Sequence, residues 1–304
     1  MTTPPATRPG TPLGTPPAPR PATGTTGPAP RPATGTTGPA TRPATGTTGP
    51  APRPATVWVT GASSGFGAAI VRRFAADGAR VIASARRADR LATLAVDLGA
   101  HVLPLTLDVR DQEAVRRAVR ALPKDFAGID VLVNNAGLAK GLGPAHEADP
   151  DDWEQMLDTN CKGLLHCTRA ALPGMVARGR GHVVNLGSVA GSYPYPGGNV
   201  YGATKAFVHQ FSLNLRSDLH GTGVRVTCVE PGMCGGTEFS TVRFQGDREK
   251  ADAVYAGMRP LSADDIAESV HWATSQPAHV NVNTIELMPV AQSFAAFQVH
   301  RHSA

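Results

Sequence analysis

Tyr201 and Lys205 lie four residues apart in the segment YGATKA, a spacing that places both side chains on one face of a helix. A phenol with a pKa of about 10 is a poor base at neutral pH, and a neighbouring ammonium group lowers that pKa. Ser188, upstream at the end of an expected strand, adds a hydroxyl that can hydrogen-bond a reacting oxygen. Together these residue types predict proton transfer at an oxygen atom of a small substrate.

A glycine-rich turn follows the first expected strand and reads Gly61-Ala62-Ser63-Ser64-Gly65-Phe66-Gly67. Glycines let the backbone approach a pyrophosphate, and the N-terminus of the following helix directs N–H groups at it. A tight turn without a ligand is the alternative, but the position between a strand and a helix favours a dinucleotide. The predicted contacts in this turn are Gly61, Ser63, Ser64, Gly65, Phe66 and Gly67.

The end of the second expected strand indicates which dinucleotide binds. NAD sites place an acid there, on the ribose 2′-hydroxyl, but this chain reads Ser84-Ala85-Arg86-Arg87 with no acid before Asp89. The small residue leaves room for a 2′-phosphate, which Arg86, helped by Ser84 and Arg87, can hold by charge-assisted hydrogen bonds. A solvated helix start would also explain the arginines, although cations are unfavourable at that end of a helix. We therefore expect NADP as the cofactor.

Seven short β-rich segments alternate with helical segments and must position these groups. The expected strands are 56–60, 80–84, 101–107, 129–133, 182–186, 224–229 and 283–287. One expected helix carries Ile70, Val71 and Phe74, and others cover 111–121, 151–177, 200–220 and 263–274, the last with a capping box at Ser262 and Asp265. The alternation predicts an α/β fold, a single Rossmann-type doubly wound domain with a seven-stranded parallel sheet. Its ligands should bind beyond the carboxyl ends of the strands.

Residues 1–55 differ from the rest in composition. They hold 16 of the 27 prolines, and an 11-residue repeat begins at Arg20, Arg31 and Arg42. The repeat has no apolar stripe, so we expect a disordered low-complexity tail before a folded domain at 56–304. A docking arm for an acidic partner is one alternative. Another is a translation start near Val57, which would omit the tail.

The tail also carries the whole formal charge of +5, so the rest of the chain is neutral. A nucleic-acid-binding domain would need basic residues gathered on a folded face, so we expect no nucleic-acid partner. No apolar run approaches the roughly 18 residues of a membrane span, and the N-terminus lacks the apolar region of a secretory signal. Four cysteines without a C-x-x-C pair fit reduced thiols, and no histidine pair has metal-ligand spacing with a third partner. We expect a cytoplasmic protein with no membrane contact and no metal.

Further motifs identify a family. TGASSGFG (60–67), LDV (107–109), NNAG (134–137), TN (159–160), Ser188, YGATK (201–205) and PG (231–232) occur in the order typical of short-chain dehydrogenases/reductases. The resemblance covers nearly all of residues 56–304 and none of the tail. Within the family, the segments 190–227, 235–244 and 277–290 are most similar to NADP-dependent members that act on 3-hydroxy acids.

The resemblance implies a role for each matched residue. Tyr201 is expected to be the general acid and base, Lys205 to lower its pKa and hold the nicotinamide ribose, and Ser188 to orient the substrate. Asn160 is expected to hold a water that links Lys205 to solvent. The remaining expected cofactor contacts are Asp108, Val109, Asn135, Ala136, Gly137, Pro231, Gly232, Cys234 and Thr237. Those of Cys234 and Thr237 are the least constrained, because PGMCGGT is one residue longer than the family's Pro-Gly-x-Val-x-Thr.

The expected activity is reversible oxidation of a 3-hydroxy acid to a 3-oxo acid. Candidate substrates are serine, L-allo-threonine, 3-hydroxyisobutyrate and 3-hydroxypropionate, whose carboxylate needs a cationic partner. The long connection 232–260 suggests a substrate lid, and its Arg243, between Val242 and Phe244, could bind that carboxylate or tie the lid to the body by a salt bridge.

Three other functions are compatible with parts of the sequence. A reductase for other ketones or 3-oxoacyl carriers would need no carboxylate partner. A non-catalytic NADP sensor would lose the acid and base, whereas this chain keeps Ser188, Tyr201 and Lys205. An adaptor would use the folded domain only to anchor the tail.

The apolar content of two helices predicts self-association. The helices expected at 151–177 and 200–220 carry more apolar surface than one sheet face needs, and the resemblance implies that they pair across subunits. The C-terminal segment from 283 is also apolar. We expect a homotetramer.

Overall fold

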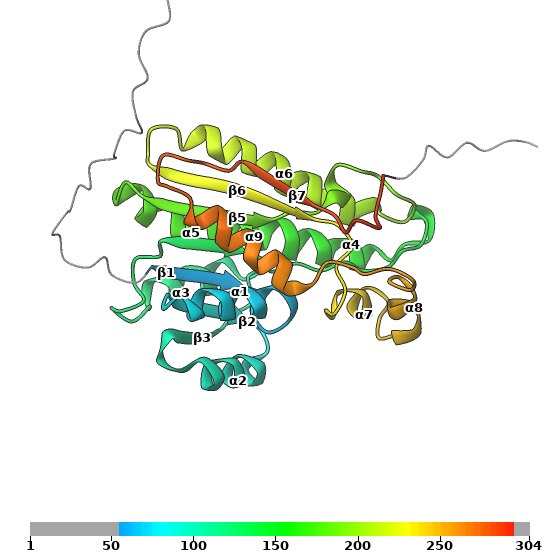
Figure 1. Cartoon of the computed structure of the whole chain (residues 1–304), viewed down its shortest axis with the longest axis horizontal. Coiled ribbons are helices and arrows are strands. Elements are labelled where there is room, and N and C mark those ends of the chain that lie inside the picture. The colour runs from blue at the N-terminus through cyan, green and yellow to red at the C-terminus, as the bar shows by residue number, and fades with distance from the viewer. Residues whose placement is uncertain (1–54, 295–304) are drawn as a thin grey trace, which may run out of the picture. The chain divides into compact units, whose positions relative to one another are not determined.

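The computed structural model describes residues 55–294, which form one parallel sheet between two layers of helices (Figure 1). The sheet has seven strands in the order β3-β2-β1-β4-β5-β6-β7. They are β1 (Thr56–Thr60), β2 (Arg80–Ala85), β3 (Val102–Thr106), β4 (Val131–Asn134), β5 (Gly181–Leu186), β6 (Val224–Pro231) and β7 (Thr284–Leu287). This arrangement confirms the predicted doubly wound fold. The predicted tail lies outside the described residues, except for Ala55.

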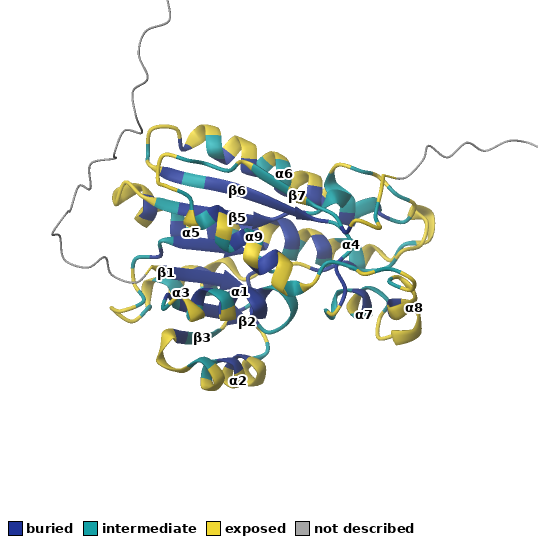
Figure 2. Cartoon of the chain, in the orientation of Figure 1, coloured by how far each residue is buried: buried dark blue, intermediate teal, exposed yellow. Residues whose placement is uncertain are grey.

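Alternation along the strands builds two apolar cores, one on each face of the sheet. On β1, Val57 and Val59 face one core and Trp58 faces the other, as the two-residue period of a strand requires. The first core is closed by α1 (Gly65–Ala76), α2 (Ala88–Leu98) and α9 (Ala263–Ser275), and the second by α3 (Gln112–Arg120), α5 (Leu164–Ala177) and α6 (Asn199–Asp218). The five inner strands are accordingly buried almost throughout, whereas the edge strands β3 and β7 are partly exposed (Figure 2).

The strand order reverses direction at β1. The chain runs from β1 outward through β2 to β3 and then returns to β4 on the other side of β1. A crevice therefore opens beyond the carboxyl ends of β1 and β4, where the loops turn to opposite faces of the sheet. Asn135 joins the two ends, because its side-chain amide donates to the carbonyl oxygens of Thr60 and Gly61 at 2.8 and 3.2 Å.

Two short helices stand between β6 and α9, in the segment predicted to be a lid. They are α7 (Phe239–Arg243) and α8 (Arg248–Ala253), which lie beside each other past the carboxyl ends of the strands (Figure 1). Their position over this end of the sheet makes the segment part of the crevice wall.

The helices follow the sequence pattern with one informative exception. The predicted helix at 151–177 is α4 (Pro150–Leu157) and α5 joined by a π-helical turn at Asp158–Gly163. The predicted capping box is present, with Ser262 and Asp265 exchanging hydrogen bonds at the start of α9. Among residues 55–294, no helix has both the length and the apolar character that a bilayer crossing requires.

Candidate active site

A cavity of about 710 Å³ occupies the crevice at the carboxyl ends of the strands. Its walls come from the glycine turn, the end of β2, the loops after β3, β4 and β5, α6 and the lid segment. Nearly all the predicted cofactor residues line it, from Gly61 and Ser63 to Cys234 and Thr237. The sequence motifs thus meet in one place although up to about 180 residues separate them.

The glycine turn has the geometry that only glycine permits. Gly61 and Gly65 have φ values of +67° and +51°, in the left-handed region. Gly67 does not line the cavity, because it packs behind the turn, where a Cβ atom would lie 2.3 Å from the carbonyl oxygen of Gly61. Ser64, the residue before α1, makes no capping hydrogen bond with its side chain. The turn therefore presents backbone rather than side chain to the cavity at the N-terminus of α1.

The end of β2 differs from the prediction at one residue. Ser84 is buried and does not line the cavity. Its hydroxyl accepts a hydrogen bond from Trp58 Nε1 at 2.9 Å and donates to the carbonyl oxygen of Val59 at 3.3 Å. Ser84 is therefore occupied inside the sheet, and the structure does not support its predicted contact with a 2′-phosphate.

The two arginines after β2 point to different tasks. Arg86 is exposed and lines the cavity, as does Asp108, whose carboxylate is held by Arg110 at 2.6 Å. Hydrogen bonding from Arg110 and the nearby charge of Arg86 lower the pKa of Asp108. Arg87 instead reaches across the glycine turn, where it donates to the hydroxyls of Ser63 and Ser64 at distances of 2.7 to 3.1 Å.

Arg87 also forms a contact that the sequence did not suggest. Its NH1 group lies 2.8 Å from Oε2 of Glu238, and NH1 of Arg90 lies 2.7 Å from Oε1 of the same carboxylate. Burial opposes ionisation of Glu238, but these hydrogen bonds prevail and lower its pKa to about 2. No local pattern marks Glu238, because its partners are about 150 residues away in the chain.

Tyr201, Lys205 and Ser188 converge on the inner end of the cavity. Tyr201 and Lys205 lie one helical turn apart on α6, with the Lys205 Nζ atom 5.8 Å from the centre of the Tyr201 ring. Lys205 donates to the carbonyl oxygen of Leu186 at 2.8 Å, and Ser188 donates to that of Pro231 at 3.3 Å. Both partners are strand ends, so the sheet fixes the side chains that α6 presents.

Burial shifts both titratable groups toward their neutral forms. Tyr201 and Lys205 are 7% and 8% exposed. Burial raises the pKa of Tyr201, although a hydrogen bond from Ser188 opposes this, and burial lowers the pKa of Lys205 to about 8. The sequence predicted a Tyr201 pKa lowered by Lys205. In the structure burial dominates and raises the pKa of Tyr201, and the cation that acts to lower it is Arg243 rather than Lys205.

Asn160 lies in the π-helical turn, where an extra residue per turn moves its side chain inward. It is buried, accepts from the Leu138 N–H at 2.9 Å, and donates to the Leu138 carbonyl oxygen and Thr204 Oγ1 at 2.9 and 3.0 Å. Asn160 therefore joins the loop after β4 to α6, directly behind Lys205. Its predicted role in holding a water remains a prediction.

Arg243 lies at the end of α7 and reaches the catalytic side chains. Its Nε donates to the carbonyl oxygen of Gly141 at 3.0 Å and its NH2 to the Tyr195 hydroxyl at 2.9 Å. Within residues 55–294, its hydrogen-bond partners are thus a carbonyl and a phenol, not the carboxylate of the predicted salt bridge. The guanidinium carbon lies 5.5 and 5.6 Å from the ring centres of Tyr195 and Tyr201.

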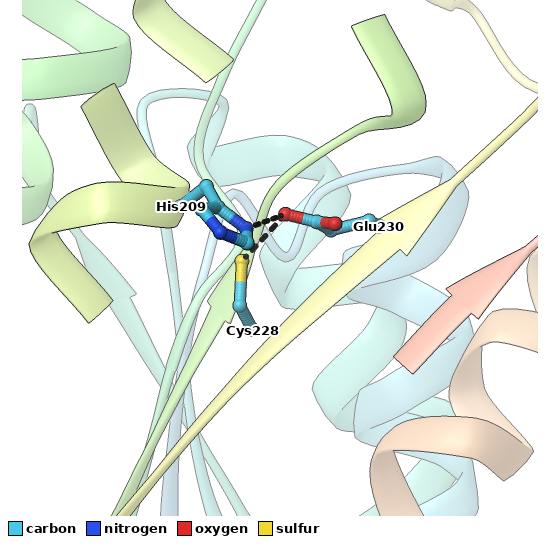
Figure 3. A group of neighbouring side chains, drawn as sticks. All are labelled: His209, Cys228 and Glu230. Atoms are coloured by element: carbon cyan, nitrogen blue, oxygen red, sulfur yellow. Dashed lines mark hydrogen bonds and ion pairs between the residues drawn. The ribbon is translucent and has the colours of Figure 1, made fainter. Parts of the chain in front are cut away.

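A second group of polar side chains lies behind this site. His209, the next residue on the Tyr201–Lys205 face of α6, meets Glu230 and Cys228 of β6 (Figure 3). His209 Nδ1 is 2.6 Å from Glu230 Oε1, and Cys228 Sγ is 3.5 Å from the same oxygen. Burial raises the pKa of Cys228 to about 12, and its thiol and His209 share one carboxylate oxygen of Glu230. The geometry fits a hydrogen-bonded cluster that supports the site from within.

Comparisons with known proteins show the family of the chain. The family model described as short chain dehydrogenase matches residues 55–247. The NADP-dependent 3-hydroxy acid dehydrogenase YdfG of Salmonella typhi is 61% identical over 245 residues, which cover 81% of this chain and 99% of that protein. The serine 3-dehydrogenase of Rhizobium radiobacter is 54% identical over 248 residues, 82% of this chain and 99% of that protein. A solved structure described as the closed form of serine dehydrogenase complexed with NADP+ is 57% identical, with a TM-score of 0.80, over 81% of this chain and 99% of that one.

Proposed function

The chain belongs to the short-chain dehydrogenase family, and from that premise we propose that it is an NADP-dependent oxidoreductase that interconverts 3-hydroxy acids and 3-oxo acids. The observation that carries the proposal is the position of Arg243 beside Tyr201. A positive guanidinium 5.6 Å from the ring of the acid and base suits a substrate that carries a carboxylate near its reacting hydroxyl. The similarity to a 3-hydroxy acid dehydrogenase and a serine 3-dehydrogenase supports the same substrate class.

The residues that line the cavity fit NADP. The backbone of the glycine turn can approach a pyrophosphate closely, because Gly61 and Gly65 have no side chain. Both also adopt left-handed φ values that other residues rarely adopt. Arg86 is exposed and lines the cavity at the end of β2, where the strand carries no acid of its own, and Arg87 follows it in the chain. We expect Asp108 and Asn135 to contact the adenosine side of the cofactor, and Pro231, Gly232, Cys234 and Thr237 its nicotinamide side. When bound, NADP supplies the acceptor or donor of hydride.

The protein's own residues move the proton. In oxidation, the Tyr201 oxygen accepts the proton of the substrate hydroxyl as the hydrogen on the same carbon leaves as hydride, and in reduction Tyr201 returns it. Ser188 hydrogen-bonds the substrate oxygen and orients it. The ammonium of Lys205 stabilises the phenolate of Tyr201 electrostatically, an effect that the buried surroundings strengthen.

A dehydrogenase assay tests the proposal directly. L-serine, L-allo-threonine, 3-hydroxyisobutyrate and 3-hydroxypropionate should each be oxidised faster with NADP than with NAD. An uncharged alcohol of similar size, secondary for L-allo-threonine and primary for the other three, is the matched control and should have a much higher KM. Equal kcat/KM values for the alcohol and the acids would contradict the assigned substrate class.

The alternatives differ at identifiable residues. A reductase for other ketones or 3-oxoacyl carriers would not depend on Arg243, so its activity would survive loss of that guanidinium. A non-catalytic NADP sensor would not need the acid and base, yet Ser188, Tyr201 and Lys205 lie together at the cavity. Turnover by a protein lacking residues 1–55 would exclude an adaptor in which the folded domain only anchors the tail.

We also propose a cytoplasmic homotetramer. Within residues 55–294, five of the twelve exposed large apolar side chains lie on the helices predicted to pair across subunits: Leu157, Leu165, Val176, Phe207 and Leu213. The four cysteines are free and buried, as suits a reducing compartment. Solution scattering at micromolar concentration should give the mass of four chains, and a monomer would contradict the proposal.

A further inference from the structure

The lid is joined to the cofactor side of the cavity through one carboxylate. Glu238 immediately precedes α7 and accepts hydrogen bonds from Arg87 and Arg90 through separate oxygens. The three side chains are 39% to 45% exposed, so the contact is a surface network with one acid between two bases. An isolated exposed ion pair contributes little, but a network with two well-aligned hydrogen bonds fixes a segment more firmly.

Arg87 is itself held by the glycine turn. Its Nε and NH2 groups bind Ser63 and Ser64, which leaves NH1 for Glu238. Thr237, the residue before Glu238, lies against Gly65, where an added Cβ atom would be 3.4 Å from the threonine side chain. The start of α7 is therefore seated on the turn that is expected to bind the pyrophosphate.

The other end of α7 lies at the acid and base. Arg243 is only five positions after Glu238, and its guanidinium lies over Tyr201. Arg243 is also joined to the loop after β4 through its backbone, because the Gly141 N–H donates to the Arg243 carbonyl oxygen at 3.1 Å. A helix this short transmits a displacement of one end to the other, so the place of Arg243 depends on where Glu238 is held.

We propose that Glu238 is a positioning residue that fastens α7 to Arg87 and Arg90 and so holds Arg243 over Tyr201. Glu238 need not touch the substrate, and it acts through the helix that it anchors. One part of the proposal rests on the proposed function: the effect on substrate binding requires that Arg243 bind the substrate carboxylate. The fastening of α7 is a property of the protein alone and can be measured without any substrate.

Amide hydrogen exchange of residues 238–244 measures the fastening. In Glu238→Gln these amides should exchange about three- to tenfold faster than in the parent protein, since the loss of two partly exposed ion pairs corresponds to a change of that order. Arg90→Gln should give a smaller increase, about two- to fivefold, because Arg90 does not line the cavity and its ion pair is with Glu238. Glu249→Gln, an exposed acid of α8, is the matched control and should leave the exchange unchanged. Amides of β1 and β5 report whether each variant is folded.

Kinetics measures the consequence for the site. In Glu238→Gln the KM for L-serine should rise by about the same factor as the exchange rate. The kcat should stay within about twofold of the parent value, because Tyr201, Ser188 and Lys205 are unchanged. Unchanged exchange of α7 would overturn the proposal, and so would faster exchange with an unchanged KM. Tighter NADP binding by Glu238→Gln with unchanged exchange would show instead that Glu238 competes with the cofactor phosphate, and would overturn it too. If the parent protein oxidises no 3-hydroxy acid, the proposed function fails while the exchange result still decides whether Glu238 fastens α7.

Discussion

The guanidinium carbon of Arg243, at the end of α7, lies 5.6 Å from the centre of the Tyr201 ring in α6. The charge of Arg243 acts to lower the pKa of Tyr201, against the larger effect of burial. One cation can therefore stand close to a substrate anion and to the group that exchanges its proton.

Arg243→Leu tests the substrate contact. We expect the KM for 3-hydroxy acids to rise about 10- to 100-fold, since a charge-assisted contact to the carboxylate is lost, while an uncharged alcohol is spared. Steady-state kinetics with both substrates measures the difference, and Arg248→Leu, an exposed arginine of the same segment, is the control. Equal losses on the two substrates would make Arg243 structural.

Arg86→Asp tests the cofactor preference. It removes the partner of the 2′-phosphate and adds a repulsive charge, so NADP affinity should fall about 10- to 100-fold while NAD is tolerated. Ser84→Ala is the contrasting variant, because its hydroxyl bonds Trp58 and not the cavity. It should destabilise the protein by about 1–3 kcal/mol and leave the NADP/NAD ratio unchanged. A ratio that moved in Ser84→Ala would return Ser84 to the phosphate site.

Tyr201→Phe tests the acid and base. Turnover should fall by about 10²- to 10⁴-fold, because the hydroxyl transfers the proton, whereas NADP binding should change by less than about threefold. Single-turnover kinetics and a fluorescence titration with NADPH measure the two effects separately. Substantial residual turnover would remove Tyr201 from this role.

Lys205→Met tests the cost of burying the ammonium. The folded pKa of Lys205, about 8, is below its ordinary value of 10.5. The unfolded chain therefore binds more protons between these pH values, so stability rises with pH across that window and the penalty is complete below about pH 8. Removing the ammonium should raise the free energy of unfolding of the cofactor-free protein by about 1–2 kcal/mol at pH 7, after the lost hydrogen bond to Leu186 is subtracted. It should also make that free energy nearly independent of pH between 8 and 10.

Denaturant unfolding at pH 7 and pH 9.5 measures both effects. Turnover by Lys205→Met should be strongly reduced. A variant less stable than the parent at both pH values would show that the hydrogen bond to Leu186, rather than desolvation, dominates at this position.

The sequence was sufficient to predict the seven strands and the convergence of the motifs at one edge of the sheet. Short β-rich segments mark each of the seven strands, and the parallel order brings Gly61, Ser188 and Tyr201 to one edge. The prediction that Ser84 contacts the 2′-phosphate was based on its residue type and did not consider which face of the strand it lies on. It lies two residues after Ile82, whose side chain faces the core that contains Trp58, so strand alternation directs Ser84 to the same side.

Other features depend on contacts between distant segments. The Glu238 contact joins residues about 150 positions apart and leaves no periodic trace. The π-helical turn at Asn160 shifts one residue within a run whose apolar pattern still reads as a continuous helix. The His209 cluster could have been found, since 209 continues the spacing of 201 and 205 and meets alternate residues of β6.

The hydroxyl of Ser64 stands where α1 would receive a side-chain cap, but Arg87 engages it and no cap is formed. The amide groups of the first turn thus end the helix toward the cavity. An anion that binds there accepts hydrogen bonds from these amide groups, which have no side-chain acceptor. The N-terminus of α1 is therefore capped by the ligand rather than by the chain. Occupancy and folding are then linked quantities. The protein's melting temperature should rise with the free concentration of its dinucleotide. At a concentration of 100 times Kd, the free energy of unfolding should increase by about 2.7 kcal/mol.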